Sequence, residues 1–214
     1  MRILLAPSPL LGGTVYEPFV AALRSRGHQV VVADVTVGDA SAEAFAAALA
    51  ARAVGADLVV PHSNAGRFAA RAAAAARASV VYVDALLPDS TVPADLAAFL
   101  RDLAADDGLL PPWTEWWPAA EVEAAVPAST LDLLWRTQPR VTLGFLLTDP
   151  APVPRWREQS AAYLAFGETY ATERAAAEAA GWPTRTLDGG HLHLVTAPDE
   201  VAAEVETFAR GLAP

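Results

Sequence analysis

Short runs of β-branched and aliphatic residues alternate along this chain with longer segments whose apolar residues recur every three to four positions. The short runs are typical of buried parallel strands, and the longer segments are typical of amphipathic helices. Their regular alternation favours βαβ units in an α/β fold. The pattern predicts strands over 2–7, 29–35, 57–61, 80–84, 161–167 and 183–187, and helices over 15–27, 42–55, 67–78, 172–181 and 198–211.

This alternation stops between residues 87 and 157. Prolines cluster at positions 111, 112, 118, 127, 139, 150, 152 and 154. Because proline disrupts both helix interiors and central strands, irregular structure is expected here, with helices over 94–105 and 129–137. We therefore expect a single domain over residues 1–214 that carries an insertion over 87–157.

A candidate nucleophile lies where the third predicted strand meets the following helix, in the run P-H-S-N-A-G at residues 61–66. A serine at the apex of a strand, tight turn and helix has its hydroxyl exposed above the edge of a parallel sheet. Ala65 and Gly66 allow the strand and helix to approach closely. The run departs from G-x-S-x-G at two places, because Pro61 replaces the first glycine and Ala65 stands just before the last one. The alternative reading of Ser63 is an ordinary N-cap.

A candidate base follows the last predicted strand, in the run L-D-G-G-H-L-H at residues 187–193. His191 stands directly after the two glycines, before a predicted helix. His193 is a competing base, although its neighbours Leu192 and Leu194 favour a structural role. His62 precedes the serine, and strand alternation predicts that it points the opposite way and packs.

With the serine turn first and the histidine loop near the end, the chain resembles the α/β-hydrolase family, in the small form common among bacterial serine hydrolases. The resemblance covers nearly the whole chain and is strongest over 60–66, 81–88 and 181–201. It implies a mostly parallel six-stranded sheet flanked by helices, with 87–157 as a cap. It also implies cofactor-free hydrolysis of an ester, thioester or related acyl bond through an acyl-Ser63 intermediate, with His191 as the base.

The acid that would orient His191 departs from the family pattern. The family usually has an aspartate in a G-x-x-D turn after the penultimate strand, where this chain has Tyr170. One candidate acid is Asp84, which ends the strand after the serine helix, a placement that some lipases of this fold use. The other is Glu168, two residues before the usual position. A Ser-His dyad is the third possibility.

The resemblance further implies an oxyanion hole. One donor is expected to be the backbone N–H of Asn64, directly after the nucleophile. The second is expected from the loop after the first strand, where the family often has His-Gly and this chain has P-S-P-L at residues 7–10. Since proline has no N–H, Ser8 and Leu10 are the candidates, and Ser8 could also offer its hydroxyl.

Composition excludes several kinds of chemistry. There is no cysteine, and all 15 basic residues are arginine, so thiolate nucleophiles, cysteine-based zinc sites, P-loop lysines and Schiff-base lysines are excluded. We expect no cofactor and no metal. A net charge of −10 argues against nucleic acid and anionic membrane surfaces as partners. No apolar run is long enough to span a bilayer, and a cytoplasmic location is expected.

The segment P-P-W-T-E-W-W-P carries Trp113, Trp116 and Trp117. Each ring could fill the core, but three so close together are too crowded for all to do so. We expect at least one to face a ligand cavity, and hence a hydrophobic small-molecule substrate. Two other functions stay open: a cofactor-free cyclase, lyase or isomerase that uses the same pocket, and a catalytically idle binding protein of the same fold.

Overall fold

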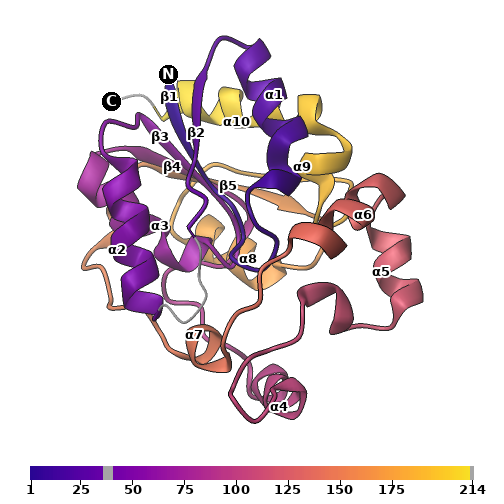
Figure 1. Ribbon diagram of the computed structural model, residues 1–214. Helices are drawn as coiled ribbons and strands as arrows, with labels where there is room; N and C mark the ends of the chain where they lie inside the picture. Colours follow the sequence, from indigo (N-terminus) through magenta and orange to yellow (C-terminus); the bar gives the residue numbers. More distant parts are fainter. Residues whose placement is uncertain (36–40, 213–214) are drawn as a thin grey trace.

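The computed structural model describes residues 1–35 and 41–212. Its centre is a six-stranded sheet with the order β2-β1-β3-β4-β5-β6, shown in Figure 1. Every neighbouring pair of strands is parallel, where a mostly parallel sheet was expected. All six predicted strands are confirmed, as β1 (Arg2–Ala6), β2 (Gln29–Val32), β3 (Leu58–Ser63), β4 (Ser79–Ala85), β5 (Ala161–Phe166) and β6 (Thr184–Leu187).

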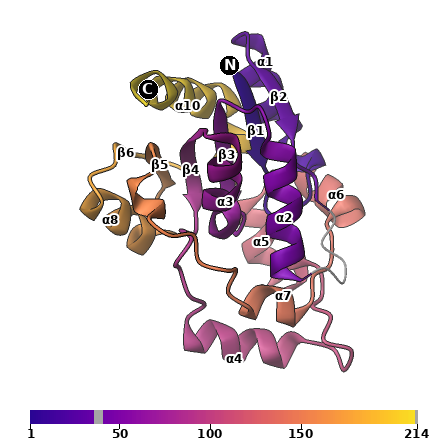
Figure 2. The ribbon, with the colours of Figure 1, turned by 90° about the vertical axis from the view of Figure 1, so that its left-hand side faces the viewer.

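Two apolar cores lie on opposite faces of the sheet. Ile3 and Leu5 belong to one core and Leu4 to the other, because successive side chains of a strand point to opposite faces. The first core contains side chains of η1 (Thr14–Tyr16), α1 (Glu17–Ser25), α9 (His193–Thr196) and α10 (Pro198–Gly211). The second contains side chains of α2 (Ala42–Ala53), α3 (Gly66–Ala76) and α8 (Ala171–Ala179). Figure 2 shows α2 and α3 in front of the strands.

The long connection between β4 and β5 contains the two helices predicted there and two that were not predicted. The predicted ones are α4 (Ala94–Leu103) and α6 (Ala128–Thr137), and the others are α5 (Ala119–Ala125) and α7 (Leu143–Leu147). The connection also contains two 3-10 turns: η2 (Trp113–Glu115) lies between α4 and α5, and η3 (Trp156–Glu158) lies between α7 and β5. In Figures 1 and 2, α4 and α7 lie beyond the lower ends of the strands, which are the carboxyl ends because β1 starts near the top.

The strand order places Ser63 at the part of the sheet where open α/β proteins bind their ligands. β1 and β3 are neighbours although β2 lies between them in the sequence, so the direction of strand addition reverses at their junction. Ligands of open α/β sheets bind outside the carboxyl ends of the strands at such a junction. Ser63 is the last residue of β3 and therefore stands there. Within the described ranges, no helix is both long and apolar enough to cross a membrane.

Candidate active site

Ser63 sits in a tight turn between β3 and α3 with left-handed backbone, at a φ of 57°. For a residue with a Cβ atom, this conformation costs about 1–2 kcal/mol. The turn is closely packed, since a Cβ atom added to Gly66 would lie 1.9 Å from the carbonyl oxygen of Leu86. Glycine at position 66 therefore allows α3 to start directly above the end of β4, with the Ser63 hydroxyl at the carboxyl edge of the sheet.

The structure brings Ser63, His191 and Asp84 into one hydrogen-bonded line. Ser63 Oγ lies 3.0 Å from His191 Nε2, and His191 Nδ1 lies 2.6 Å from Asp84 Oδ2. Asp84 is completely buried, and its other oxygen accepts a hydrogen bond from the Phe166 N–H at 2.9 Å. Because a carboxylate accepts hydrogen bonds, Nδ1 of His191 carries the ring proton and Nε2 is the acceptor for the Ser63 hydroxyl.

Asp84 also has left-handed backbone, at a φ of 40°. Tyr163 of the neighbouring strand β5 stabilises this conformation by hydrogen bonds to Ala85. The Tyr163 hydroxyl donates to the carbonyl oxygen of Ala85 at 2.6 Å and accepts from the Ala85 N–H at 3.1 Å. Burial raises the pKa of Tyr163, so the hydroxyl keeps its proton. Tyr163 thereby holds the bend at the end of β4 that carries the Asp84 carboxylate towards His191.

Glu168 and His193, the other candidates for acid and base, lie elsewhere. The side chain of Glu168 is 78% exposed and pairs with Arg174 at 3.4 Å. His193 Nε2 lies 3.0 Å from Glu200 Oε2. The reason is local: Glu168 stands on the solvent side of the turn before α8, and His193 starts the short helix α9.

Tyr170, the residue in place of the usual family acid, contacts the candidate nucleophile. Its hydroxyl lies 3.3 Å from Ser63 Oγ, and its ring packs against that of His191 with centroids 5.5 Å apart. Burial raises the pKa of the Tyr170 hydroxyl, which therefore stays protonated at neutral pH. The turn after β5 thus presents a neutral hydrogen-bond donor where the family pattern has a carboxylate.

His62 takes part in a buried hydrogen-bonded chain that strand alternation did not predict. Its Nδ1 lies 2.7 Å from the Tyr16 hydroxyl, and its Nε2 lies 2.9 Å from the carbonyl oxygen of His191. The His62 ring also stacks on that of His191, with centroids 4.6 Å apart. The expectation that His62 packs is confirmed: like Val60 two residues earlier, it lies on the face of the sheet that carries Tyr16, and its side chain is buried. What strand alternation could not predict is that this packing brings His62 against the His191 loop.

The direction of each hydrogen bond in this chain follows from its first member. The Tyr16 hydroxyl accepts from the Ser8 N–H at 2.9 Å, so its own proton goes to His62 Nδ1. His62 Nε2 then carries a proton and donates it to the His191 carbonyl oxygen. Burial, and secondarily the charge of His191, hold the pKa of His62 well below its usual value. His62 is therefore a neutral support beneath the His191 loop.

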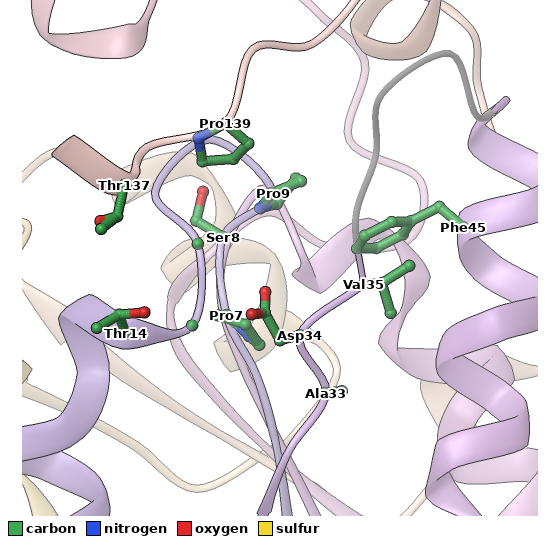
Figure 3. A pocket seen from close by; sticks show the side chains of 12 residues that line it. Pro7, Ser8, Pro9, Thr14, Ala33, Asp34, Val35, Phe45, Thr137 and Pro139 are labelled. Atoms are coloured by element: carbon green, nitrogen blue, oxygen red, sulfur yellow. The ribbon is translucent and has the colours of Figure 1, made fainter. Parts of the chain in front are cut away.

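In the loop after β1, the N–H groups that were expected to serve as oxyanion donors already donate hydrogen bonds within the protein. The Ser8 N–H donates to Tyr16, and the Leu10 N–H donates to Ser8 Oγ at 3.3 Å. Leu10 lines the cavity that contains Ser63, but Ser8 lines a smaller one of about 200 Å³, shown in Figure 3. Among the described residues, the backbone N–H of Asn64 has no hydrogen-bond acceptor. Of the three expected donors, Asn64 is the one whose N–H is available.

Ser63 and His191 open onto a cavity of about 850 Å³. Its apolar wall is formed by Leu87, Val92, Leu96, Leu100, Trp113, Trp116, Trp117 and Leu146. All three tryptophans of the P-P-W-T-E-W-W-P segment are on this wall. Its polar lining includes the ion pair of Arg157 and Asp89 and the hydrogen bond from Ser90 to Glu173. The sequence analysis did not nominate Arg157, because no local motif marks it.

No family model matches this chain, and no curated protein sequence matches it. Solved structures do. One is an extracellular α/β-hydrolase from a Paenibacillus species, described as sharing structural and functional homology with tobacco salicylic acid binding protein 2. It is 14% identical to this chain with a TM-score of 0.75, and the match covers 97% of this chain and 98% of that protein. Tomato methylketone synthase I complexed with 2-tridecanone has 13% identity and a TM-score of 0.75 over 99% and 98%. A pyrethroid hydrolase from Sphingobium faniae JZ-2 has 18% identity and a TM-score of 0.69 over 98% and 97%.

These similarities extend over nearly the full length of both chains in each comparison. The protein therefore has the α/β-hydrolase fold, as the sequence motifs suggested. At these identities the likeness concerns the fold, and function has to be argued from the site. In the part of the chain that the structure describes, no group of three or more histidine, cysteine, aspartate or glutamate side chains could hold a metal ion.

Proposed function

We propose that the protein is a cofactor-free serine hydrolase that cleaves an ester, thioester or related acyl bond of a hydrophobic small molecule. The observation that carries the proposal is the line from Ser63 Oγ through His191 to the buried Asp84, with distances of 3.0 and 2.6 Å. Two of the similar folds, the Paenibacillus and Sphingobium proteins, are hydrolases by name, which supports the same class of reaction.

Acylation follows from this geometry. Ser63 Oγ bonds to the acyl carbon while its proton moves to His191 Nε2, and the carbonyl π electrons move to the carbonyl oxygen. The Asn64 N–H, next to the start of α3, donates a hydrogen bond to that oxyanion. His191 then gives the proton to the leaving group as its bond to carbon breaks. Asp84 keeps His191 in the required tautomer and stabilises the imidazolium.

Deacylation repeats these steps with water. His191 removes a proton from a water molecule that attacks the acyl-Ser63 carbonyl, and then returns the proton to Ser63 Oγ as the acid is released. Each proton lost is recovered within the cycle, so the reaction needs no cofactor.

We further propose that residues 87–157 form the cap of this site. They supply most of the apolar wall of the cavity, including the three tryptophans and the leucines of α4. Apolar walls with a few polar groups at the reacting centre favour a largely hydrophobic ligand. The 2-tridecanone in the tomato methylketone synthase structure is a ligand of that kind, bound to a protein of the same fold.

Labelling with a fluorophosphonate and measurement of turnover of activated esters test the proposal. The reagent should label Ser63, and Ser63→Ala and His191→Ala should each remove nearly all turnover with the fold intact. The double variant should be little worse than either single one, because the two residues act as a unit. Asp84→Asn should lower turnover by about 10⁴-fold by favouring the wrong imidazole tautomer.

Glu168→Gln is the matched control for Asp84→Asn, because it also neutralises a carboxylate next to the site but should leave turnover nearly unchanged. Full esterase activity in Ser63→Ala would contradict the proposal. Ligand binding without labelling would instead support a cyclase, lyase or isomerase that uses the same pocket, or a binding protein.

A further inference from the structure

Two groups share the Ser63 hydroxyl oxygen, and the direction of both hydrogen bonds can be worked out. His191 Nε2 lies 3.0 Å and the Tyr170 hydroxyl 3.3 Å from Ser63 Oγ. Nδ1–H of His191 is donated to Asp84, so Nε2 accepts the single proton of Ser63. Ser63 has no second proton to donate. Tyr170 is therefore the donor in its contact with the candidate nucleophile.

The site is short of donors for an oxyanion. Hydrolases of this kind stabilise the developing negative charge with donors held in advance, and the loss of one costs about 10²–10³-fold in rate. The Asn64 N–H supplies one donor. In the loop after β1, Pro7 and Pro9 have no N–H, and the N–H groups of Ser8 and Leu10 are already donated within the loop and to Tyr16.

Tyr170 has the properties of the missing donor. Its hydroxyl borders the cavity, keeps its proton at neutral pH, and within the described ranges has Ser63 Oγ as its one hydrogen-bond partner. Its ring packs on His191 and against the core beneath α8, which fixes the position of the hydroxyl. A donor held in this way requires little reorganisation when charge develops nearby.

We propose that Tyr170 is a catalytic residue whose hydroxyl, together with the Asn64 N–H, forms the oxyanion hole. This inference rests on the proposed function. When Ser63 Oγ bonds to the acyl carbon, the carbonyl oxygen comes to about 2.3 Å from Oγ, because both atoms are bonded to that carbon. The Tyr170 hydroxyl, already next to Oγ, turns from Oγ to this oxygen.

The proton balance of this step is simple. The Ser63 proton goes to His191, the carbonyl π pair goes to oxygen, and Tyr170 donates a hydrogen bond without losing its proton. When the leaving group departs, the electron pair returns to form the carbonyl of the acyl enzyme. The same donor serves the tetrahedral intermediate of deacylation, so Tyr170 acts in both halves of the cycle.

The test compares Tyr170→Phe with the native enzyme on an activated ester. The variant keeps the ring and its packing, so kcat should fall by about 10²–10³-fold while KM changes by less than about threefold. Tyr82→Phe is the matched control, because it also removes a buried tyrosine hydroxyl; in the described part of the chain that of Tyr82 has no hydrogen-bond partner, and Tyr82 does not line the cavity. Tyr82→Phe should leave kcat unchanged.

A transition-state analogue separates oxyanion stabilisation from mere alignment of Ser63. The inhibition constant of a trifluoromethyl ketone, which forms a tetrahedral adduct with the serine, should rise in Tyr170→Phe by the factor by which kcat/KM falls. Binding of the product acid should stay the same. A lower kcat with unchanged inhibition by the ketone would overturn the assignment.

The outcomes also separate this inference from the proposed function. If the native enzyme is labelled at Ser63 but Tyr170→Phe keeps kcat/KM within about threefold, the inference is wrong and the proposed function stands. If the native enzyme is not labelled, the proposed function itself fails. Should Tyr170→Phe not fold, Tyr170→His keeps a ring N–H donor, and it should retain more activity than Tyr170→Leu; equal loss in the two would overturn the inference.

Discussion

At the scale of single residues, a buried chain of hydrogen bonds runs from Ser8 through Tyr16 and His62 to the His191 carbonyl, next to the candidate nucleophile. The directions of these bonds determine which ring nitrogen of His62 carries a proton. A neutral His62 satisfies both of its partners, accepting from Tyr16 and donating to His191. A charged His62 would carry a second ring proton, with the Tyr16 hydroxyl left between two donors. Folding is therefore coupled to the protonation of this one histidine.

We expect the stability of the protein to fall as the pH drops below about 6.5, the ordinary histidine pKa that His62 has in the unfolded chain. Burial lowers its pKa in the folded protein, so the unfolded chain takes up the proton first. The contribution of His62 is thus present above about pH 6.5 and is lost below it, with a slope of up to about 1.4 kcal/mol per pH unit.

Urea unfolding between pH 5 and 7.5 measures this dependence. His62→Gln should be less stable at pH 7.5 and should lose stability less steeply as the pH falls. His191 and Tyr16, the titratable groups that face His62, are present in both proteins, so the difference in slope reports on His62. His28→Gln is the control, since burial also lowers the pKa of His28, but away from the site. Parallel pH profiles for native protein and His62→Gln would contradict this account.

The sequence was sufficient to nominate Ser63, His191 and Asp84, because each stands at a strand end or in a glycine turn that a local pattern marks. It could not provide the contacts of Tyr170 with Ser63 and of His62 with the His191 loop. These pairs are separated by 107 and 129 residues, and no local periodicity encodes which donor faces which acceptor over such distances.

At the scale of helices and strands, the number of residues in an element determined whether the sequence could predict it. The six strands and the longer helices contain enough residues for their apolar periodicity to be visible. The helices that were missed, α5, α7 and α9, have seven, five and four residues. Moreover, Pro118 is the N-cap residue of α5, because a proline that cannot stand inside a helix can still stand directly before its first residue. The proline cluster was therefore interpreted as irregular structure, although some of its prolines stand directly before helices.

The close approach of α3 to the end of β4 gives a prediction at this scale. In Gly66→Ala, the new Cβ would lie 1.9 Å from the Leu86 carbonyl oxygen, a backbone atom that cannot move without shifting the strand end next to Asp84. We expect the free energy of unfolding to fall by about 1–3 kcal/mol or more, with loss of turnover.

Gly211→Ala is the matched control for this substitution. Gly211 ends α10, and among the described residues no atom outside its chain neighbours and its own helix backbone lies within 4 Å of the position of its Cβ. Because alanine favours helix more than glycine does, this variant should be as stable as the native protein or up to about 1 kcal/mol more stable. Urea unfolding of both variants checks the pair. A Gly66→Ala variant as stable and active as Gly211→Ala would refute the packing argument.

At the scale of the whole molecule, the cavity is lined both by Ser63 and His191 and by many residues of the segment over 87–157. Its apolar wall predicts a preference for long acyl chains. Specificity, measured as kcat/KM on a series of acyl esters, should rise with chain length by up to roughly 0.8 kcal/mol per buried methylene. Trp113→Ala should flatten this dependence, because the Trp113 ring is part of the cavity wall.

Trp135→Ala is the control for the loss of an indole. Trp135 is 58% exposed and belongs to α6, outside the set of residues around the cavity, so its removal should leave the chain-length dependence as it is in the native protein. A native profile that is flat from short to long chains would argue against the hydrophobic substrate. Equal effects of the two substitutions would argue against the role of Trp113.

The left-handed backbone at Ser63 and Asp84, on adjacent strands, also bears on how a lineage of such proteins would change. Each position costs folding free energy that glycine or asparagine would largely recover. If the two residues act as proposed, natural selection retains a serine and an aspartate there only while that chemistry contributes to survival. In a descendant that kept the fold and no longer needed the reaction, mutation would tend to replace both residues and release the strain. The residues at these two positions in any relative therefore record whether its ancestors continued to depend on catalysis.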